Sequence, residues 1–141
     1  MRTVEEHQSI VAALFPRPRS VTVPAAAALG RVLAGDIVAG VTLPGFDNSA
    51  MDGYAVIASD IAHATETDPV ILPVAEDIPA GRTDQLTLAP GTAHRIMTGA
   101  PVPAGADAVI QVELTDGGVS EVRINAPVPA GAAIRAAGSD I

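Results

Sequence analysis

Lysine, cysteine and tryptophan are absent from this 141-residue sequence, and one Tyr and two Phe supply all of its aromatic side chains. Without cysteine the chain forms no disulfide, no thiolate metal site and no thiol nucleophile. Without lysine it cannot build the Gly-Lys-Ser/Thr loop that holds phosphates in P-loop proteins. The scarcity of aromatics means that a core must come from Ala, Val, Leu and Ile, which bury less area per residue. We therefore expect a thin core that a partner surface completes.

Positive charge is scarce as well. Eight Arg stand against 16 Asp and Glu, which gives a net charge of −8. Such a surface repels nucleic-acid phosphates and anionic lipids, so we expect neither nucleic-acid nor membrane binding. The N-terminus lacks the apolar stretch of a secretory signal, and no apolar run reaches the roughly 20 residues of a membrane span. These features predict a cytoplasmic protein.

The N-terminal third carries helical signals. Thr3 and Glu6 have the spacing of a capping box, and apolar residues follow at helical spacing, which predicts a helix over Val4–Phe15. Pro24 suits the first turn of a short helix over Ala25–Leu29. From Gly53 onward the pattern changes to short β-type runs bounded by Gly, Pro, Asp or Asn. These runs are Tyr54–Ala58, Val70–Ala75, Leu86–Leu88, His94–Met97, Ala108–Val112 and Val119–Ile124.

One seven-residue sequence occurs twice. Ala-Pro-Val-Pro-Ala-Gly-Ala stands at Ala100–Ala106 and again at Ala126–Ala132, with a shorter echo at Pro79–Gly81. Pro at the second and Gly at the fourth position of a turn are typical of type I. We interpret the repeat as one turn sequence used more than once, because its irregular spacing does not indicate a solenoid.

Polar side chains gather most densely in residues 44–56, where Asp47, Asn48, Ser49 and Asp52 precede an apolar strand. Asp-Asn-Ser and Asp-Gly both favour tight turns, so a well-made turn is one reading of this segment. It is not an EF-hand loop, because that loop needs Gly and Glu where this chain has Asp52 and Ala58. Ser49 lacks the Gly-x-Ser-x-Gly setting of a nucleophile, and the three His are too scattered to support a base or a zinc site.

Two later segments carry further candidates. At Thr98-Gly99 a predicted strand ends, where a hydroxyl and backbone N–H groups can meet an anion, although a plain hairpin is the alternative. In Gly131–Ile141, Arg135 and Asp140 are the only charges in a stretch of small and apolar residues. Charges in such a setting serve a ligand or a partner, or else belong to a frayed tail.

Together these segments resemble the MoeA/gephyrin family of molybdopterin molybdenumtransferases. Gly45–Val56 reads Gly-Phe-Asp-Asn-Ser-Ala-Met-Asp-Gly-Tyr-Ala-Val, the most recognisable run of that family. Arg95–Val109 matches its Arg-Ile-Met-Thr-Gly-Ala-Pro-Val-Pro-x-Gly-Ala-Asp-Ala-Val run. Ile134–Ile141 matches Ile-Arg-x-x-Gly-x-Asp-Ile. The three motifs stand in the family's order, and the resemblance covers essentially the whole chain.

The resemblance implies a mainly β fold with a few short helices, like the N-terminal region of MoeA, in an elongated arrangement of two lobes. We expect residues 1–44 and 126–141 to form a linker and dimerisation lobe, and residues 45–125 to form a β-rich lobe. The pterin-binding α/β domain and the small C-terminal β domain of the family lie outside this chain. A fragment that lacks the pterin domain is expected to be inactive alone.

The implied reaction inserts molybdenum from molybdate into adenylylated molybdopterin, releases AMP and is assisted by Mg²⁺. Asp52 and Asp140 match catalytic carboxylates of the family and are the expected Mg²⁺ ligands. Ser49, Thr98 and Arg135 are the expected substrate-binding residues. The family usually has Glu where this chain has Ser139, and more basic residues where it has Ala136-Ala137.

Partners follow from the same resemblance. A homodimer is expected, with adenylylated molybdopterin and molybdate bound through the missing domain and no cofactor held tightly by the fragment itself. Two alternatives stay open: a non-catalytic dimerisation or scaffold module of the same family, and an unrelated acidic all-β module.

Overall fold

The computed structural model describes residues 2–16 and 18–141, and its contacts divide the chain into two units, Met1–Val38 and Ala39–Ile141. Leu43 and Pro44 hydrogen-bond residues 138–141 within the second unit. The grouping of residues 1–44 with 126–141 in one lobe stays a prediction.

The first unit holds one α-helix and one short 3₁₀ helix. Helix α1 spans Val4–Ala13, and its capping box is complete: Glu6 N donates to Thr3 Oγ1 at 3.2 Å, and Thr3 N donates to Glu6 Oε2 at 3.0 Å. The helix ends two residues before the predicted Phe15. Helix η1 spans Ala25–Ala27, inside the predicted short helix. None of residues 2–16 and 18–38 is buried, so this part of the chain has no core of its own.

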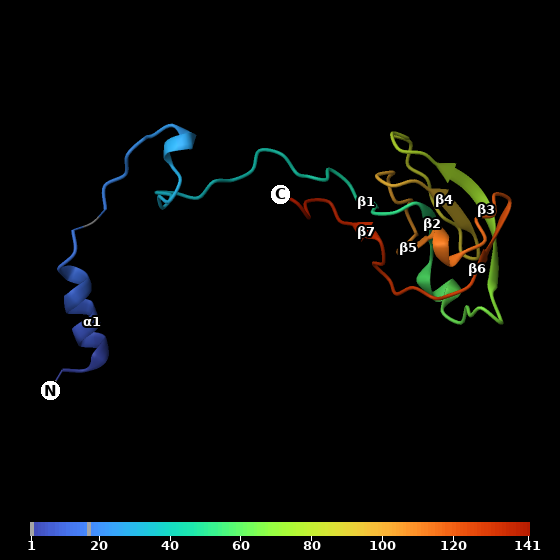
Figure 1. The fold of residues 1–141 in the computed structure, drawn as a ribbon, viewed down its shortest axis with the longest axis horizontal. Helices are drawn as coiled ribbons and strands as arrows, with labels where there is room; N and C mark the ends of the chain where they lie inside the picture. The colour runs from blue at the N-terminus through green and yellow to red at the C-terminus, as the bar shows by residue number, and fades with distance from the viewer. Residues whose placement is uncertain (1, 17) are drawn as a thin grey trace. The chain divides into compact units, whose positions relative to one another are not determined.

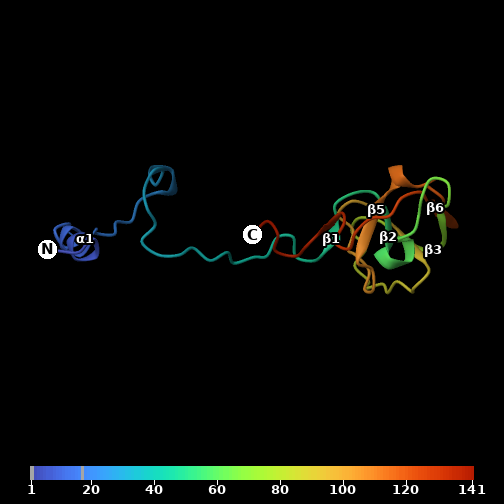
Figure 2. The same ribbon diagram turned by 90° about the horizontal axis from the view of Figure 1, so that it is seen from below.

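The second unit contains a curled five-stranded sheet in the order β5-β2-β4-β3-β6 (Figures 1 and 2). Strands β3 and β4 are parallel and the other pairs are antiparallel. A separate pair, β1 and β7, lies where the chain enters and leaves the sheet. The mainly β fold class is thereby confirmed. The bounds are β1 Asn48–Ser49, β2 Gly53–Val56, η2 Ala58–Ile61, β3 Val70–Ile78, β4 Ala93–Ile96, β5 Ala108–Gln111, η3 Val112–Leu114, β6 Glu121–Ile124 and β7 Ile134–Arg135.

One predicted strand is wrong. Leu86–Leu88 is not part of the sheet; instead it meets the turn of the first repeat, where Ala104 N donates to Leu86 O at 2.9 Å and Leu88 N donates to Ala104 O at 2.8 Å. The predicted turn type is also wrong. Ala106 N donates to Pro103 O, and only Gly105, at the third position, has positive φ (+90°), which is the signature of type II.

Both faces of strand β2 are buried, which is why its sequence is continuously apolar after Gly53. Tyr54 and Val56 join one core cluster, and Ala55 joins a smaller one on the opposite face. Tyr54 is 1% exposed, and its hydroxyl donates to Gly118 O at 2.7 Å. Buried Ile and Val side chains make up most of the rest, as the scarcity of aromatics predicts.

His94 on β4 is the one buried titratable side chain whose polar atom lacks a partner among the described residues. It is 3% exposed, and its Nδ1 accepts and donates no hydrogen bond. Burial lowers the pKa of His94; nearby Arg82 lowers it further, and Glu76 opposes the shift. His94 is therefore neutral in the native state at pH 7.

Protonation of His94 is expected to destabilise the fold in mild acid. With a native pKa below the usual value of 6.5, the unfolded chain binds more protons than the native one around that pH. The free energy of unfolding should therefore fall as the pH drops from about 7 through 6.5 and below. Urea unfolding from pH 7.5 to 5 should show this slope in the wild type, and His94→Leu should flatten it. The exposed His63 is the matched control, so an equal loss of slope in His63→Gln would contradict the assignment.

Candidate functional site

The segment around β1 brings all three sequence motifs together. On one side Ser49 N donates to Ala100 O, and Val102 N donates to Asp47 O, each at 3.0 Å. On the other side β1 pairs with β7, with Asn48 opposite Arg135 and Ser49 opposite Ile134. Residues of motifs that lie about 50 and 90 positions apart along the chain therefore meet at one short strand.

Asp52 and Thr98 form the first polar pair of this site. Asp52 Oδ1 accepts the Thr98 backbone N–H and the Thr98 hydroxyl, each at 2.7 Å. These hydrogen bonds lower the pKa of Asp52, the hydroxyl contributing most, and Arg95 adds a smaller effect. The carboxylate is exposed and ionised at neutral pH, and no described residue bonds its Oδ2. A carboxylate of low pKa is a poor general base but a good partner for a cation.

Thr98 is occupied by this pair, because its hydroxyl and its N–H both donate to Asp52. The next N–H, that of Gly99, donates to Ser49 O at 2.8 Å. The Thr98 hydroxyl and N–H thus meet an anion of the chain itself, the Asp52 carboxylate, whereas the Gly99 N–H meets a backbone carbonyl; a contact of these groups with a substrate anion stays a prediction. Only the lone pairs of the Thr98 hydroxyl are left for a ligand, and the substrate-binding role of Thr98 stays a prediction.

Asn48 and Arg135 form the second polar pair. Arg135 Nε and Nη2 both donate to Asn48 Oδ1, at 3.0 and 2.8 Å. Asp47 adds a link between the same two segments, because its Oδ1 accepts Ala137 N–H at 2.8 Å. Arg135 is exposed, and none of the ion pairs within residues 2–16 and 18–141 involves it. No carboxylate in the described part of the chain therefore offsets its positive charge.

Ser49 and Asp140 are placed differently from the other predicted site residues. Ser49 is fully buried, and its hydroxyl donates to Met51 O and accepts from Met51 N at 3.3 Å. In this conformation the hydroxyl stabilises the turn after β1. Asp140 is exposed; its N–H donates to Leu43 O at 3.0 Å, and its carboxylate accepts only from Ser139. The predicted catalytic role of Asp140 and substrate role of Ser49 stay predictions.

Mg²⁺ is the metal to test against these residues. Within the described part of the chain, no three His, Cys, Asp or Glu side chains gather closely enough to hold a metal ion. Mg²⁺ needs no such cage, because it is commonly held by one or two carboxylates together with waters and substrate phosphates. The free Oδ2 of Asp52 fits that mode of binding. The carboxylates of Asp52 and Asp140 bond different segments, so their joint action on one ion stays a prediction.

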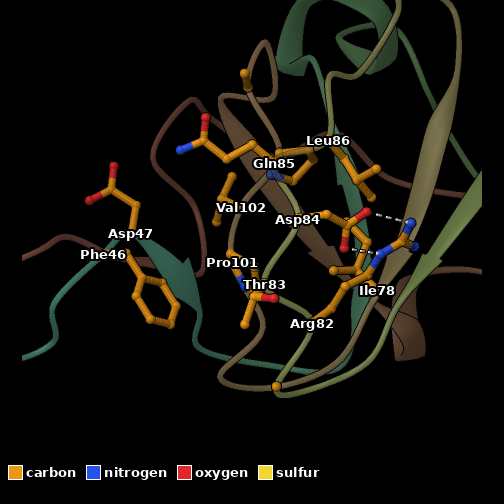
Figure 3. Close-up of a pocket in the computed structure, with 13 residues that line it drawn as sticks. Phe46, Asp47, Ile78, Arg82, Thr83, Asp84, Gln85, Leu86, Pro101 and Val102 are labelled. Atoms are coloured by element: carbon orange, nitrogen blue, oxygen red, sulfur yellow. Dashed lines mark hydrogen bonds and ion pairs between the residues drawn. The ribbon is translucent and has the colours of Figure 1, made fainter.

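One cavity lies apart from the predicted site residues. It measures about 600 Å³, and none of Ser49, Asp52, Thr98, Arg135 and Asp140 lines it. Figure 3 shows Phe46 and Asp47 on one side, Arg82 and Asp84 on the other, and Pro101 and Val102 between them; residues 83, 85 and 86 also line the cavity. Arg82, its one basic residue, is bound by Asp84 at 2.7 Å and by Glu76 at 3.0 Å. Among the described residues no cation pairs with Asp47, so this cavity repels anions and does not suit an oxyanion substrate.

Sequence reasoning missed Asn48 and Asp47 as site residues. Both lie in the densest polar segment, but there their types indicate only a turn. Their partners are 87 and 90 residues away, so no local pattern reveals them.

Comparisons with known proteins agree on one family. The family model "MoeA N-terminal region (domain I and II)" matches residues 2–141. Molybdopterin molybdenumtransferase 2 of Mycobacterium tuberculosis is 60% identical over 141 residues, which is 100% of this chain and 35% of that protein. Molybdopterin molybdenumtransferase 1 of the same organism is 40% identical over 156 residues, with 37% of its length covered. The chain thus spans about a third of these relatives.

Solved structures give the same result. A molybdopterin biosynthesis moeA protein from Pyrococcus horikoshii superposes with a TM-score of 0.70 at 39% identity, over 84% of this chain and 31% of that one. A second structure of the moeA protein from this organism gives a TM-score of 0.69 at 37% identity, over 97% and 35% of the two chains. Within residues 2–16 and 18–141, no helix has the length and apolar character needed to cross a membrane.

Proposed function

The chain belongs to the MoeA family, whose N-terminal region it matches, and on that premise we propose that it supplies part of the active site of a molybdopterin molybdenumtransferase. The proposed reaction takes adenylylated molybdopterin and molybdate, leaves molybdenum on the dithiolene and releases AMP. We place the reaction in the cytoplasm. The observation that supports this most is the meeting of the three motifs at β1: Asn48 of β1 holds the Arg135 guanidinium, and Asp52, which follows β1 along the chain, has a free carboxylate oxygen.

The residue types suit this chemistry. Both substrates are anions, and the exposed Arg135 can bind a phosphate or an oxyanion through charge-assisted hydrogen bonds. Asp52 would hold Mg²⁺ directly or through its waters, with Asp140 as the proposed second carboxylate. When bound, Mg²⁺ would offset the negative charge that develops on the phosphate oxygens. Position and charge assist the cleavage of the phosphoanhydride, so no covalent nucleophile is needed.

We propose that the site is completed by the pterin domain of a second subunit. The cavity beside Asp47 is acidic, and the site around β1 offers one guanidinium without a carboxylate partner, so the pterin and its phosphates need another surface. The apolar side chains of the first unit support a homodimer, because Leu14, Leu29 and Val32 are 76%, 95% and 95% exposed. Surfaces of this kind are usually covered by a partner.

The second candidate function rests on the same exposed residues. A non-catalytic dimerisation or scaffold module would use the apolar surface of residues 2–38 for docking and would leave Asp52 and Arg135 without a role. The two candidates differ in whether turnover depends on the residues around β1, namely Asn48, Asp52, Thr98 and Arg135, which we call the β1 site.

Mixed dimers test the shared site. In the full-length protein, subunits carrying Asp52→Ala are mixed with subunits inactivated in the pterin domain, and AMP release is measured after subunit exchange. If each subunit lends its β1 site to its neighbour, half of the dimers regain one site, about a quarter of wild-type activity. Verified exchange without recovered activity would place all groups in one subunit's own site. Full activity of Asp52→Ala alone would favour the scaffold.

A further inference from the structure

Asn48 holds one edge of the Arg135 guanidinium and leaves the other edge free. A single atom, Asn48 Oδ1, accepts from both Nε and Nη2, at 3.0 and 2.8 Å. Neither the Nη1 group nor the second hydrogen atom of Nη2 forms a hydrogen bond with any residue in the described part of the chain. This outer Nη1–Nη2 edge presents two parallel N–H donors, the arrangement that binds a phosphate or other oxyanion in bidentate fashion.

The carboxamide of Asn48 is itself fixed. Asn48 is 2% exposed, and its Nδ2 donates to Phe46 O at 3.2 Å, which determines the orientation of the amide. Its backbone is held on both sides, opposite Arg135 in β7 and opposite Pro101 in the second motif. The Asn48 side chain therefore loses its rotational freedom on folding rather than on substrate binding. Because it accepts two hydrogen bonds from Arg135, it also fixes the orientation of the guanidinium before the substrate binds.

We propose that Asn48 is a positioning residue of the active site, which orients Arg135 toward the anionic substrate without neutralising its charge. This inference rests on the proposed function. An amide oxygen is a hydrogen-bond acceptor with no net charge, so the guanidinium keeps its positive charge for the ligand. That matters in a chain whose net charge is −8, because an anionic substrate then depends on a cation that no carboxylate offsets. Arg82 shows the opposite arrangement, because its guanidinium is paired with the carboxylates of Asp84 and Glu76 and so links parts of the fold instead of binding a ligand.

The comparison of Asn with Asp at position 48 separates orientation from charge. A carboxylate in place of the amide would lose the hydrogen bond to Phe46 O, but it would hold the guanidinium through an ion pair, which is stronger than a bond to a neutral amide. It would also cancel the charge that the substrate needs. If Asn48 served only to pack β1 against β7, the loss of charge would not affect substrate binding. The proposal predicts instead that Asn48→Asp weakens the binding of an anion.

A double-mutant cycle in the full-length protein tests this inference, with KM for adenylylated molybdopterin and kcat measured by AMP release. Asn48→Ala is expected to raise KM about tenfold, with a smaller effect on kcat, because the guanidinium loses its orientation. In the Arg135→Ala background the same change should have no further effect on KM, because Asn48 acts through Arg135. Asn125→Ala, at the only other Asn of the chain, is the matched control and should leave KM unchanged.

Asn48→Asp should raise KM at least as much as Asn48→Ala, and it should flatten the dependence of KM on KCl, since a neutralised guanidinium has less charge to screen. A wild-type KM in Asn48→Asp, or additive effects in the cycle, would overturn the inference. Unfolding in urea is measured for every variant, and a purely structural role would change stability equally in both backgrounds. Failure of the proposed function looks different, because the wild-type protein itself would then release no AMP.

Discussion

Replacing Asp52 by Asn in the full-length protein is expected to lower kcat about 100-fold, the order seen when one preorganised electrostatic group is removed from an active site. Asn keeps an oxygen in the place of Oδ1, so the two hydrogen bonds from Thr98 can persist. What the variant loses is the negative charge and with it the affinity of Oδ2 for a cation. Turnover should therefore fall while the position of the Thr98 loop is retained.

The free energy of unfolding should change little in Asp52→Asn, since the side chain is exposed and no described residue relies on Oδ2. Urea unfolding and AMP release are measured on the same preparations. Asp52→Ala, which also loses the Thr98 bonds, should be no more active than Asp52→Asn. If Asp52→Asn kept most of its activity while Asp52→Ala lost it, the hydrogen bonds rather than the charge would be what turnover needs.

The lowered pKa of Asp52 also predicts how turnover depends on pH. Hydrogen bonds from Thr98 stabilise the ionised form, so its contribution to stability is present above the unfolded pKa and is lost as the pH falls through the lowered native value. Across neutral pH the carboxylate stays charged. A profile of kcat between pH 6 and 8 should accordingly show no titration of Asp52, which agrees with a role in binding a cation and not in moving a proton.

Features that depend on neighbours in the sequence could be predicted here. The capping box fixes the start of α1 because Thr3 and Glu6 lie one turn apart, and the β-type runs give the five strands of the sheet within a few residues. Leu86–Leu88 has the composition of a strand, but it pairs with the turn of Ala104, and composition does not determine the partner.

In the site, too, local features could be predicted from the sequence and long-range contacts could not. Asp52, Thr98 and Arg135 could be proposed because each matches a family motif, but their interactions depend on distant pairing. Asn48 accepts hydrogen bonds from Arg135 because the register of β1 against β7 places the two residues opposite each other, and no local sequence pattern contains that register. Asp52-Gly53 indicates a tight turn in the sequence, whereas Gly53 begins β2, an interior strand of the sheet, and does not adopt positive φ. The reason for that glycine is steric and becomes visible only in three dimensions.

Gly53→Ala is expected to cost at least about 3 kcal/mol of folding free energy, among the largest effects of a single methyl group. A Cβ at Gly53 would lie 1.9 Å from Ile110 O, 2.9 Å from Ile110 C and 3.0 Å from Gln111 Cα. These are backbone atoms of the neighbouring strand, so no side chain can rotate away. Strand β2 cannot retreat either, because it is paired with β4 on its other side.

Two other glycines separate this close approach from backbone conformation. Gly40 has nothing within 4 Å of an added Cβ and no positive φ, so Gly40→Ala should leave stability nearly unchanged. Gly91 also has open space but a φ of +73°, so Gly91→Ala should cost about 1 kcal/mol. In urea unfolding, the loss of stability should increase in the order Gly40→Ala, Gly91→Ala, Gly53→Ala. A Gly53→Ala protein as stable as Gly91→Ala would show that β2 and β5 can separate.

The position of Gly53 links this steric demand to the site. It follows Asp52 directly, and Val112 N donates to Asp52 O at 3.1 Å as β5 runs into η3. The close pairing of β2 with β5 therefore fixes the backbone from which the Asp52 carboxylate projects toward Thr98. A Gly53→Ala protein that is kept folded, for instance by low temperature, should still lose turnover, since the carboxylate would be displaced with its strand. Normal kcat in such a folded variant would show that the pairing of β2 with β5 does not position Asp52.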